Sequence, residues 1–328
     1  MTAAKAANER PTKQGGKFMR TAILALLIGL SPIAAAAAEG PGWAFPVTDK
    51  VQPKTTPDDG KPKTAPGSDK TYTRKEINDL FNPPDWYPGM HPPMPQVVAH
   101  GNAPNVRACG ACHLPTGTGH DESAYVAVLP ARYTVEQMAA YKSGARKGSG
   151  SMTTIAKSIT PDEIHAAADY FAALKPRKWI RVVETDTVPK TYVGPGNKRL
   201  RLPDGAGEPI GNRIIEIPEN EEVVLNRDPR LGFVAFVPKG SIAKGKALAE
   251  GGGGKTIACA ICHGPALQGL GDVPPISGRQ ATYVVRQLFM IQNGDRSGSS
   301  VALMQQVVKD LTVDDMLALA AYTASREP

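Results

Sequence analysis

The sequence contains a long internal repeat, and this repeat limits the fold more than any other feature. Residues 107–146 align with 257–296 at a constant offset of 150, and a two-residue insertion then brings Met152 opposite Met304. Such self-similarity indicates a duplicated structural unit. The chain is therefore predicted to contain two copies of one domain, each of about 90 residues.

Each copy carries the pentad Cys-x-x-Cys-His, which is the attachment signature of c-type haem. One helical turn sets two thiols to reach the two vinyl groups of a porphyrin, and the adjacent imidazole points at the iron from one face. Two covalently bound haem c groups are therefore predicted. The attachment residues are Cys109, Cys112, Cys259 and Cys262, and the proximal ligands are His113 and His263.

Other uses of these four cysteines explain less of the pattern. A four-cysteine zinc site would bring the two pairs together across 146 intervening residues and would leave both histidines unexplained. A thioredoxin-like redox disulfide would need a βαβ setting, which the sequence lacks. Structural disulfides stay an open alternative in an exported chain, because such compartments oxidise thiols.

The sixth iron ligand decides between a carrier and an enzyme, because an open site admits substrate. Met152 and Met304 are the candidates, 39 and 41 residues beyond their proximal histidines. We expect both in irregular Gly/Ser-containing stretches that fold back over the haem. If either does not ligate, His100 or His165 could replace methionine in the first copy, whereas His263 is the only histidine of the second.

Arg146 and Arg296 follow a glycine at equivalent positions, and the hypothesis is that each reaches a haem propionate. The alternative is that both are solvated surface residues. Pro274 could place its carbonyl against the imidazole of His263, a contact that orients the ring. The first copy has His120 in that region, so this contact is expected to differ. Four side chains are expected to help orient the macrocycle: Tyr133, Tyr283, Gln137 and Gln287.

The formal net charge of +7 falls to +3 without residues 1–38, where five basic residues face one acid. Basic and acidic residues are otherwise interspersed, and no stripe follows a phosphate backbone. Nucleic acid is not indicated. The leader has Arg20, an apolar run at 22–30 and small residues to Ala38, which is typical of a cleaved secretory signal. Periplasmic export is therefore expected, and an uncleaved membrane anchor is the weaker alternative.

The repeat, the pentads and the methionines together resemble the dihaem class I cytochromes c, close to the cytochrome c4 and c553 group. The resemblance implies a mainly α fold of two tandem class I cytochrome c domains, each with its first and last helices crossing beside the haem. It also implies distal ligation by Met152 and Met304. Two departures are a long connection between the copies and a Pro-rich arm before the first.

Beta-branched or aromatic runs at 179–183, 213–217 and 233–237 predict short strands between the copies. Five segments are expected along the chain. The segments are a signal peptide at 1–38, a Pro-rich arm or linker at 39–80, the first cytochrome c domain at 81–178, a strand-containing connection at 179–238 and the second cytochrome c domain at 239–328.

The function expected from these features is outer-sphere electron transfer by a free shuttle or a cytochrome subunit, rather than catalysis. The donor would be a dehydrogenase or a quinol-oxidising complex, the acceptor an oxidase or reductase, and association with a membrane-bound complex is open. The connection is a hypothetical docking surface. The alternative is an enzyme with one open haem site, such as a dihaem peroxidase or a thiosulfate-oxidising cytochrome, although no cysteine remains after haem attachment to serve such a site.

Overall fold

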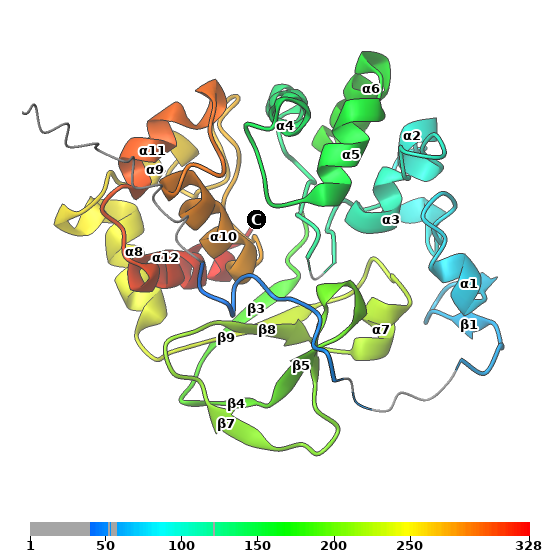
Figure 1. Cartoon of the computed structure of the whole chain (residues 1–328), viewed down its shortest axis with the longest axis horizontal. Coiled ribbons are helices and arrows are strands. Elements are labelled where there is room, and N and C mark those ends of the chain that lie inside the picture. Colours follow the sequence, from blue (N-terminus) through cyan, green and yellow to red (C-terminus); the bar gives the residue numbers. More distant parts are fainter. Residues whose placement is uncertain (1–39, 52, 54–57, 121) are drawn as a thin grey trace, which may run out of the picture. The chain divides into compact units, whose positions relative to one another are not determined.

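The computed structural model describes residues 40–51, 53, 58–120 and 122–328. The predicted signal sequence lies outside these ranges. In the described part the fold is mainly helical with small sheets (Figure 1), as predicted. No helix there is long and apolar enough to cross a bilayer.

The helices of the two repeat copies form what we call the first and second domains. The first domain has α2 (Gln96–Ala99), α3 (Cys109–His113), α4 (Ala131–Ser143), α5 (Gly150–Ser158) and α6 (Pro161–Ala172). The second domain has α8 (Ser241–Gly251), α9 (Ala260–His263), α10 (Ala281–Gln292), α11 (Ala302–Val308) and α12 (Val313–Ser325), with 3-10 turns η3 (Gly252–Gly254) and η4 (Ser299–Val301).

The last helix of each domain begins with a capping box, which satisfies amide groups that have no partner within the helix. The hydroxyl of Thr160 accepts a hydrogen bond from the Glu163 amide (3.3 Å), and the Glu163 carboxylate accepts one from the Thr160 amide (2.9 Å). Thr312 and Asp315 form the same pair at the start of α12. A hydroxyl residue followed three positions later by an acid is a sequence signature of a helix start, and both last helices carry it.

The crossing of first and last helices differs between the domains. In the second, α8 packs against α12 with Gly245 at the contact, where a Cβ would overlap the Ala318 carbonyl and lie 2.8 Å from Cβ of Tyr322. In the first, the first helix is the one-turn α2, which therefore meets α6 over a much shorter length. The reason is the proline-rich run at 82–95, since proline has no amide donor and breaks helices. The expected full crossing is therefore absent from the first domain.

The connection between the domains contains short strands and one helix. Its three-stranded sheet has the order β3-β9-β8, in which β9 is parallel to β3 and antiparallel to β8. These three strands overlap the runs expected from the sequence. The connection comprises β3 (Ile180–Glu184), β4 (Thr187–Pro189), β5 (Thr191–Val193), η2 (Pro195–Asn197), β6 (Arg199–Arg201), β7 (Gly207–Pro209), β8 (Ile215–Pro218), α7 (Glu221–Leu225) and β9 (Phe233–Val237).

The start of the Pro-rich arm packs on the second domain. Arg286 in α10 donates to the Ala44 carbonyl (2.8 Å), and the Phe45 ring meets Phe289 edge-on at 5.8 Å. Trp43 is partly buried against the same core, so several side chains anchor the start of the arm. The later arm and the segment after it form β1 (Lys63–Thr64), β2 (Thr71–Tyr72), α1 (Arg74–Ile77) and η1 (Pro88–Met90).

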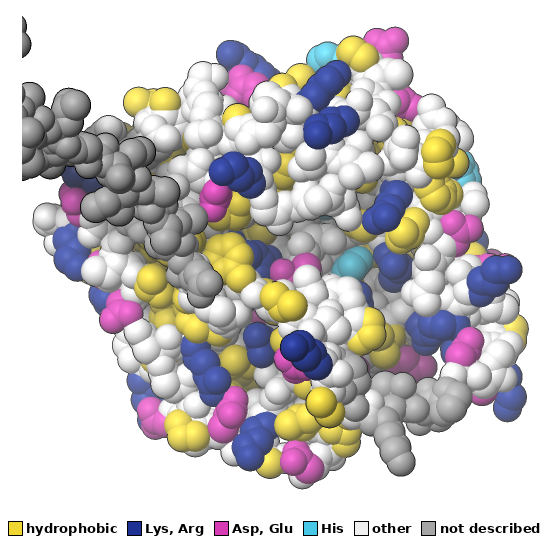
Figure 2. Space-filling model, viewed as in Figure 1, with side chains coloured by type: hydrophobic (Ala, Val, Ile, Leu, Met, Phe, Trp, Pro, Cys, Tyr) yellow, Lys and Arg dark blue, Asp and Glu magenta, His cyan; other side chains and the backbone are white. Residues whose placement is uncertain are grey.

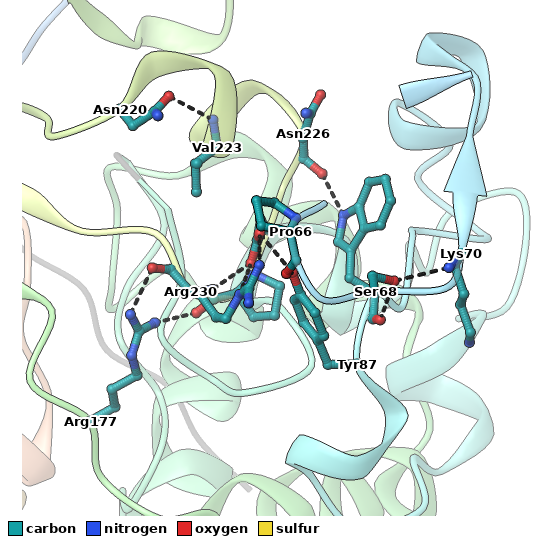
Figure 3. A network of polar contacts seen from close by, with 12 residues as sticks. Pro66, Ser68, Lys70, Tyr87, Arg177, Asn220, Val223, Asn226 and Arg230 are labelled. Atoms are coloured by element: carbon teal, nitrogen blue, oxygen red, sulfur yellow. Dashed lines mark hydrogen bonds and ion pairs between the residues drawn. The ribbon is translucent and has the colours of Figure 1, made fainter. Parts of the chain in front are cut away.

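The loop after α7 joins this N-terminal segment to the end of the first domain (Figure 3). The Trp86 indole donates to the Asn226 carbonyl (2.8 Å). Arg177 donates to the Arg230 carbonyl (2.7 Å), and Arg230 pairs with the buried Asp228 (3.1 Å). The connection is therefore packed against the first domain and its N-terminal segment by buried polar contacts.

Surface charge is mixed on the face drawn in Figure 2. Lysine and arginine side chains lie among aspartate and glutamate side chains, and neither sign gathers into a continuous patch there. This agrees with the interspersed charges of the sequence.

Candidate haem sites

The two pentad histidines end one-turn helices and are held in the same way. Nδ1 of His113 lies 2.8 Å from the Ala124 carbonyl, and Nδ1 of His263 lies 2.7 Å from the Pro274 carbonyl. A ring nitrogen that faces a carbonyl must donate, so Nε2 keeps its lone pair for a metal. Burial lowers the pKa of both imidazoles, which favours the neutral form that ligates iron.

The carbonyl contact at Pro274 was predicted and is confirmed. The expectation that the first domain differs is wrong, because Ala124 stands 150 positions before Pro274 and supplies the same group. The contact uses a backbone oxygen, so it does not depend on the side chain at that position.

None of the four pentad cysteines is joined in a disulfide in the described part of the chain. Burial raises the pKa of Cys109 to about 12 and that of Cys259 to about 11. The structural-disulfide interpretation gains no support from this arrangement. Within the described residues no three His, Cys, Asp or Glu side chains form a metal cluster, so the zinc interpretation gains no support.

Met152 and Met304 occupy matching positions as the third residues of α5 and α11, and both are half-buried. The expectation of irregular structure at these positions is wrong. Ser149 caps α5 by accepting a hydrogen bond from the Met152 amide (3.2 Å), and η4 leads directly into α11. The side chains considered as replacement ligands, His100 and His165, are both exposed.

Arg146 and Arg296 meet across the two domains as an isolated antiparallel bridge. Arg146 donates to the Tyr283 hydroxyl (3.0 Å), and Arg296 donates to the Tyr133 hydroxyl (2.7 Å), so each arginine reaches the opposite domain. Both guanidinium groups also donate, at 2.9–3.0 Å, to the same two side chains, Gln137 and Gln287.

This network is dry, because each arginine is only 6% exposed. The interpretation as solvated surface is therefore wrong, and sequence reasoning missed that the partners come from the opposite domain. Burial raises the pKa of Tyr283, but positive Arg146 and Arg296 outweigh it, and the net pKa lies below the usual value. Nε of Arg296 is buried without a hydrogen-bond partner among the described residues.

Glu216 is a buried carboxyl that the sequence did not reveal. It projects from β8, is 7% exposed, and accepts a hydrogen bond from the Ala281 amide (2.8 Å) at the start of α10. Burial raises its pKa to about 7. Nearby, Arg286 pairs with Glu122 (2.8 Å). A lone glutamate within an alternating strand would be expected to face solvent, so no sequence signal marks it.

The residues present fit a covalently bound haem at each pentad. Each offers two thiols on one helical turn and a neutral imidazole whose Nε2 is available. Each domain also offers a thioether at a matching position. The unpartnered Nε of Arg296 is a buried donor suited to an acidic group.

Comparison with known proteins decides the family. No protein-family model matches the chain. A thiosulfate dehydrogenase electron acceptor from Thiomonas intermedia is 26% identical over 226 residues, which cover 68% of this chain and 80% of that protein. Cytochrome c-554(548) from Halomonas halodenitrificans is 35% identical over 80 residues, which cover 24% of this chain and 96% of that protein. The chain belongs to the class I c-type cytochromes.

As a member of this family, the cytochrome binds haem c covalently and transfers electrons between redox partners. Among solved structures it is similar to a thiosulfate dehydrogenase from Marichromatium purpuratum, with 28% identity and a TM-score of 0.48. That match covers 69% of this cytochrome and 38% of the other chain.

Proposed function

We propose that this cytochrome is an exported carrier with two haem c groups, one in each domain, that exchanges electrons by outer-sphere transfer. The observation that carries the proposal is the duplicated pentad, with its imidazole held by a backbone carbonyl in both copies. The attachment residues are Cys109, Cys112, Cys259 and Cys262, and the axial pairs are His113 with Met152 and His263 with Met304.

A thioether in both sixth positions favours a carrier over an enzyme. It closes the iron to substrate, and it stabilises ferrous iron relative to two imidazoles, which raises the reduction potential. The equal placement of Met152 and Met304 in their helices supports the same ligand in both domains.

The proposed domain limits are 81–178 and 239–328, with the connection at 179–238. The contacts of Trp86 and Arg177 with the loop after α7, and that of Glu216 with the start of α10, support a connection that packs against both domains. Cleavage of the leader at 1–38 would release the mature protein into the periplasm.

The proposed electron donor is a thiosulfate-oxidising dehydrogenase. Support comes from two relatives whose names describe them as electron acceptors of such an enzyme, from Thiomonas intermedia and Stutzerimonas stutzeri; the second is 23% identical over 234 residues. The acceptor would be an oxidase or a reductase.

A spectrally monitored redox titration of the mature protein, produced with c-type haem maturation, tests the proposal. We expect two low-spin centres of relatively high potential, both with the weak red absorption band of sulfur-ligated ferric haem. Met152→Ala and Met304→Ala should each abolish this band at one centre, while Met138→Leu, a control in α4, should leave both bands. A high-spin centre in the unaltered protein would contradict the carrier assignment.

A further inference from the structure

We propose that the second domain positions the proximal ligand of the first haem, because Arg279 and Gln280 hold in place the loop whose carbonyl orients His113. The inference rests on the proposed function, in which His113 ligates iron. The second domain stiffens its own equivalent loop with two prolines. The two imidazoles therefore make the same hydrogen bond, and the one in the first domain depends on contact between the domains.

The loop in question, residues 123–127, lies directly against the first pentad. Its Ala124 carbonyl accepts the hydrogen bond from Nδ1 of His113 (2.8 Å). The strength of this bond falls as donor and acceptor separate or lose alignment. Both the orientation of the imidazole and its basicity toward a metal depend on the bond. The groups that fix the backbone on either side of Ala124 therefore control the proximal ligand.

Side chains of the second domain bind the carbonyls on both sides of Ala124. Their two residues stand directly before α10, and each side chain crosses to the first domain. Because the bonds reach backbone oxygens before and after Ala124, they restrict rotation of the peptide groups that carry its carbonyl. The bonds run from Gln280 to the Ser123 carbonyl (2.8 Å) and from Arg279 to the carbonyls of Tyr125 and Ala127, the latter at 3.4 Å.

These contacts are buried. Arg279 is 4% exposed and Gln280 is 1% exposed. The Arg279 guanidinium also lies over the Tyr125 ring, 4.3 Å from its centre. On its own domain's side, the Tyr125 hydroxyl accepts a hydrogen bond from the Arg177 amide (2.7 Å). Water cannot compete readily for donors and acceptors in such a place, so the loop is held firmly between the two domains.

The equivalent loop of the second domain, residues 273–277, is fixed by its own sequence. Pro274 supplies the carbonyl to His263, and Pro275 follows it. Proline fixes its own φ and also restricts the residue before it. The Val273 carbonyl accepts a hydrogen bond from the Leu270 amide of the same loop (3.1 Å). In the first domain alanine and tyrosine stand in place of the two prolines, so that loop has less intrinsic stiffness.

The first domain lacks the residues to return this support. The positions equivalent to Arg279 and Gln280 are Leu129 and Pro130, neither of which has a side-chain donor. Arg132 does pair with Asp272 beside the second loop (3.0 Å), but both side chains are largely exposed and the contact uses no backbone oxygen. Exposed pairs of this kind contribute little. The dependence therefore runs from the second domain to the first haem.

The first test measures exchange of the imidazole Nδ1 protons with solvent, by NMR of the ferrous protein labelled with 15N-histidine. Gln280→Met keeps the side-chain volume and removes the donor. It should speed exchange at His113 about tenfold and leave His263 within about twofold. The His113 signal is the one missing from His113→Ala. Arg132→Met, which breaks the exposed pair between the domains, is the control and should change neither rate.

The second test measures reduction potentials. A weaker bond to Ala124 leaves the imidazole a poorer electron donor, so ferric iron at the first haem is less stabilised. Gln280→Met should shift that haem's equilibrium about three- to tenfold toward ferrous iron, which is about 30–60 mV. Pro275→Ala should shift the second haem in the same direction and leave the first unchanged. The first haem is the centre whose red absorption band Met152→Ala removes.

Equal acceleration at both histidines in Gln280→Met would overturn the inference, because it would show a general loosening of the protein. So would unchanged exchange at His113. If Gln280→Met does not fold, Arg279→Lys supplies the same comparison, since lysine keeps the charge but loses the planar fork that reaches two carbonyls. Failure of the proposed function has a separate sign, namely fewer than two haems per chain in the unaltered protein.

Discussion

The two domains place their candidate haem-binding residues in the same way and differ in the segments that pack around them. Both place a histidine against a backbone carbonyl, a methionine third in a short helix, and a capping box on the last helix. The second domain has a complete first helix, which crosses α12 at Gly245. The first domain has a single turn there and recruits the N-terminal segment and the connection instead.

The comparison shows that a haem-attachment unit does not require one particular surrounding. In both domains the pentad lies on a helical turn and its histidine faces a backbone carbonyl, and both features come from nearby sequence. Shielding of the pentad is supplied by whichever segments pack on it. The first domain therefore gains a covered attachment helix, and the second keeps an exposed one.

The largest expected effect is loss of one haem. If the proposed function holds, His113→Ala and His263→Ala should each lower the haem content per chain from two to one, because each removes one proposed proximal ligand and leaves the other site intact. Haem per chain is measured from the absorbance of the pyridine complex against protein concentration. Loss of both haems from either single variant would show that the sites are not independent. It would contradict the view that each domain attaches its haem with its own residues.

The next effect concerns the helix crossing that only the second domain has. Gly245→Ala should destabilise the protein by about 3 kcal/mol or more, because the added methyl group meets the backbone of α12, which cannot move as a side chain would. Denaturant unfolding followed by circular dichroism measures the change. Gly251→Ala, in the last turn of the same helix with open space around it, is the control and should be nearly neutral.

The buried network between the domains predicts two effects of equal size. Arg146→Ala and Arg296→Ala should each cost roughly 2–4 kcal/mol, since each leaves the hydroxyl of the opposite domain and two amide oxygens with fewer donors. In the double variant the loss should be less than the sum, because the glutamines are shared. Additive losses in denaturant unfolding would mean that the two arginines act separately.

The smallest expected effect is a pH dependence that arises where the connection packs on the second domain. Glu216 has a folded-state pKa of about 7, above its usual value, so the folded protein binds more protons than the unfolded chain between about pH 4.5 and 7. Stability should therefore fall as pH rises through this window, by roughly 1–3 kcal/mol. Glu216→Gln should flatten that part of the profile of unfolding free energy against pH. A steeper profile in the variant would contradict the assignment.

The sequence by itself determined several features that depend on local pattern. The repeat indicated the duplication, the pentads indicated where haem would attach, and Thr160 and Thr312 mark the helix starts. The connection strands could be located because β-branched runs bounded by proline and glycine are local signals as well. These inferences succeed because the interactions that form them lie within a few residues.

Only the tertiary structure decided which residues from distant parts of the chain contact one another. Arg146 and Arg296 occur in a local motif, yet their partners lie in the opposite domain. Glu216 resembles an exposed strand residue until α10 packs on it, and the exposure of Ala111 depends on a loop 116 positions away. Contacts between residues so far apart leave no periodic signal in the chain, because they are set by packing of the whole core and not by local backbone preference.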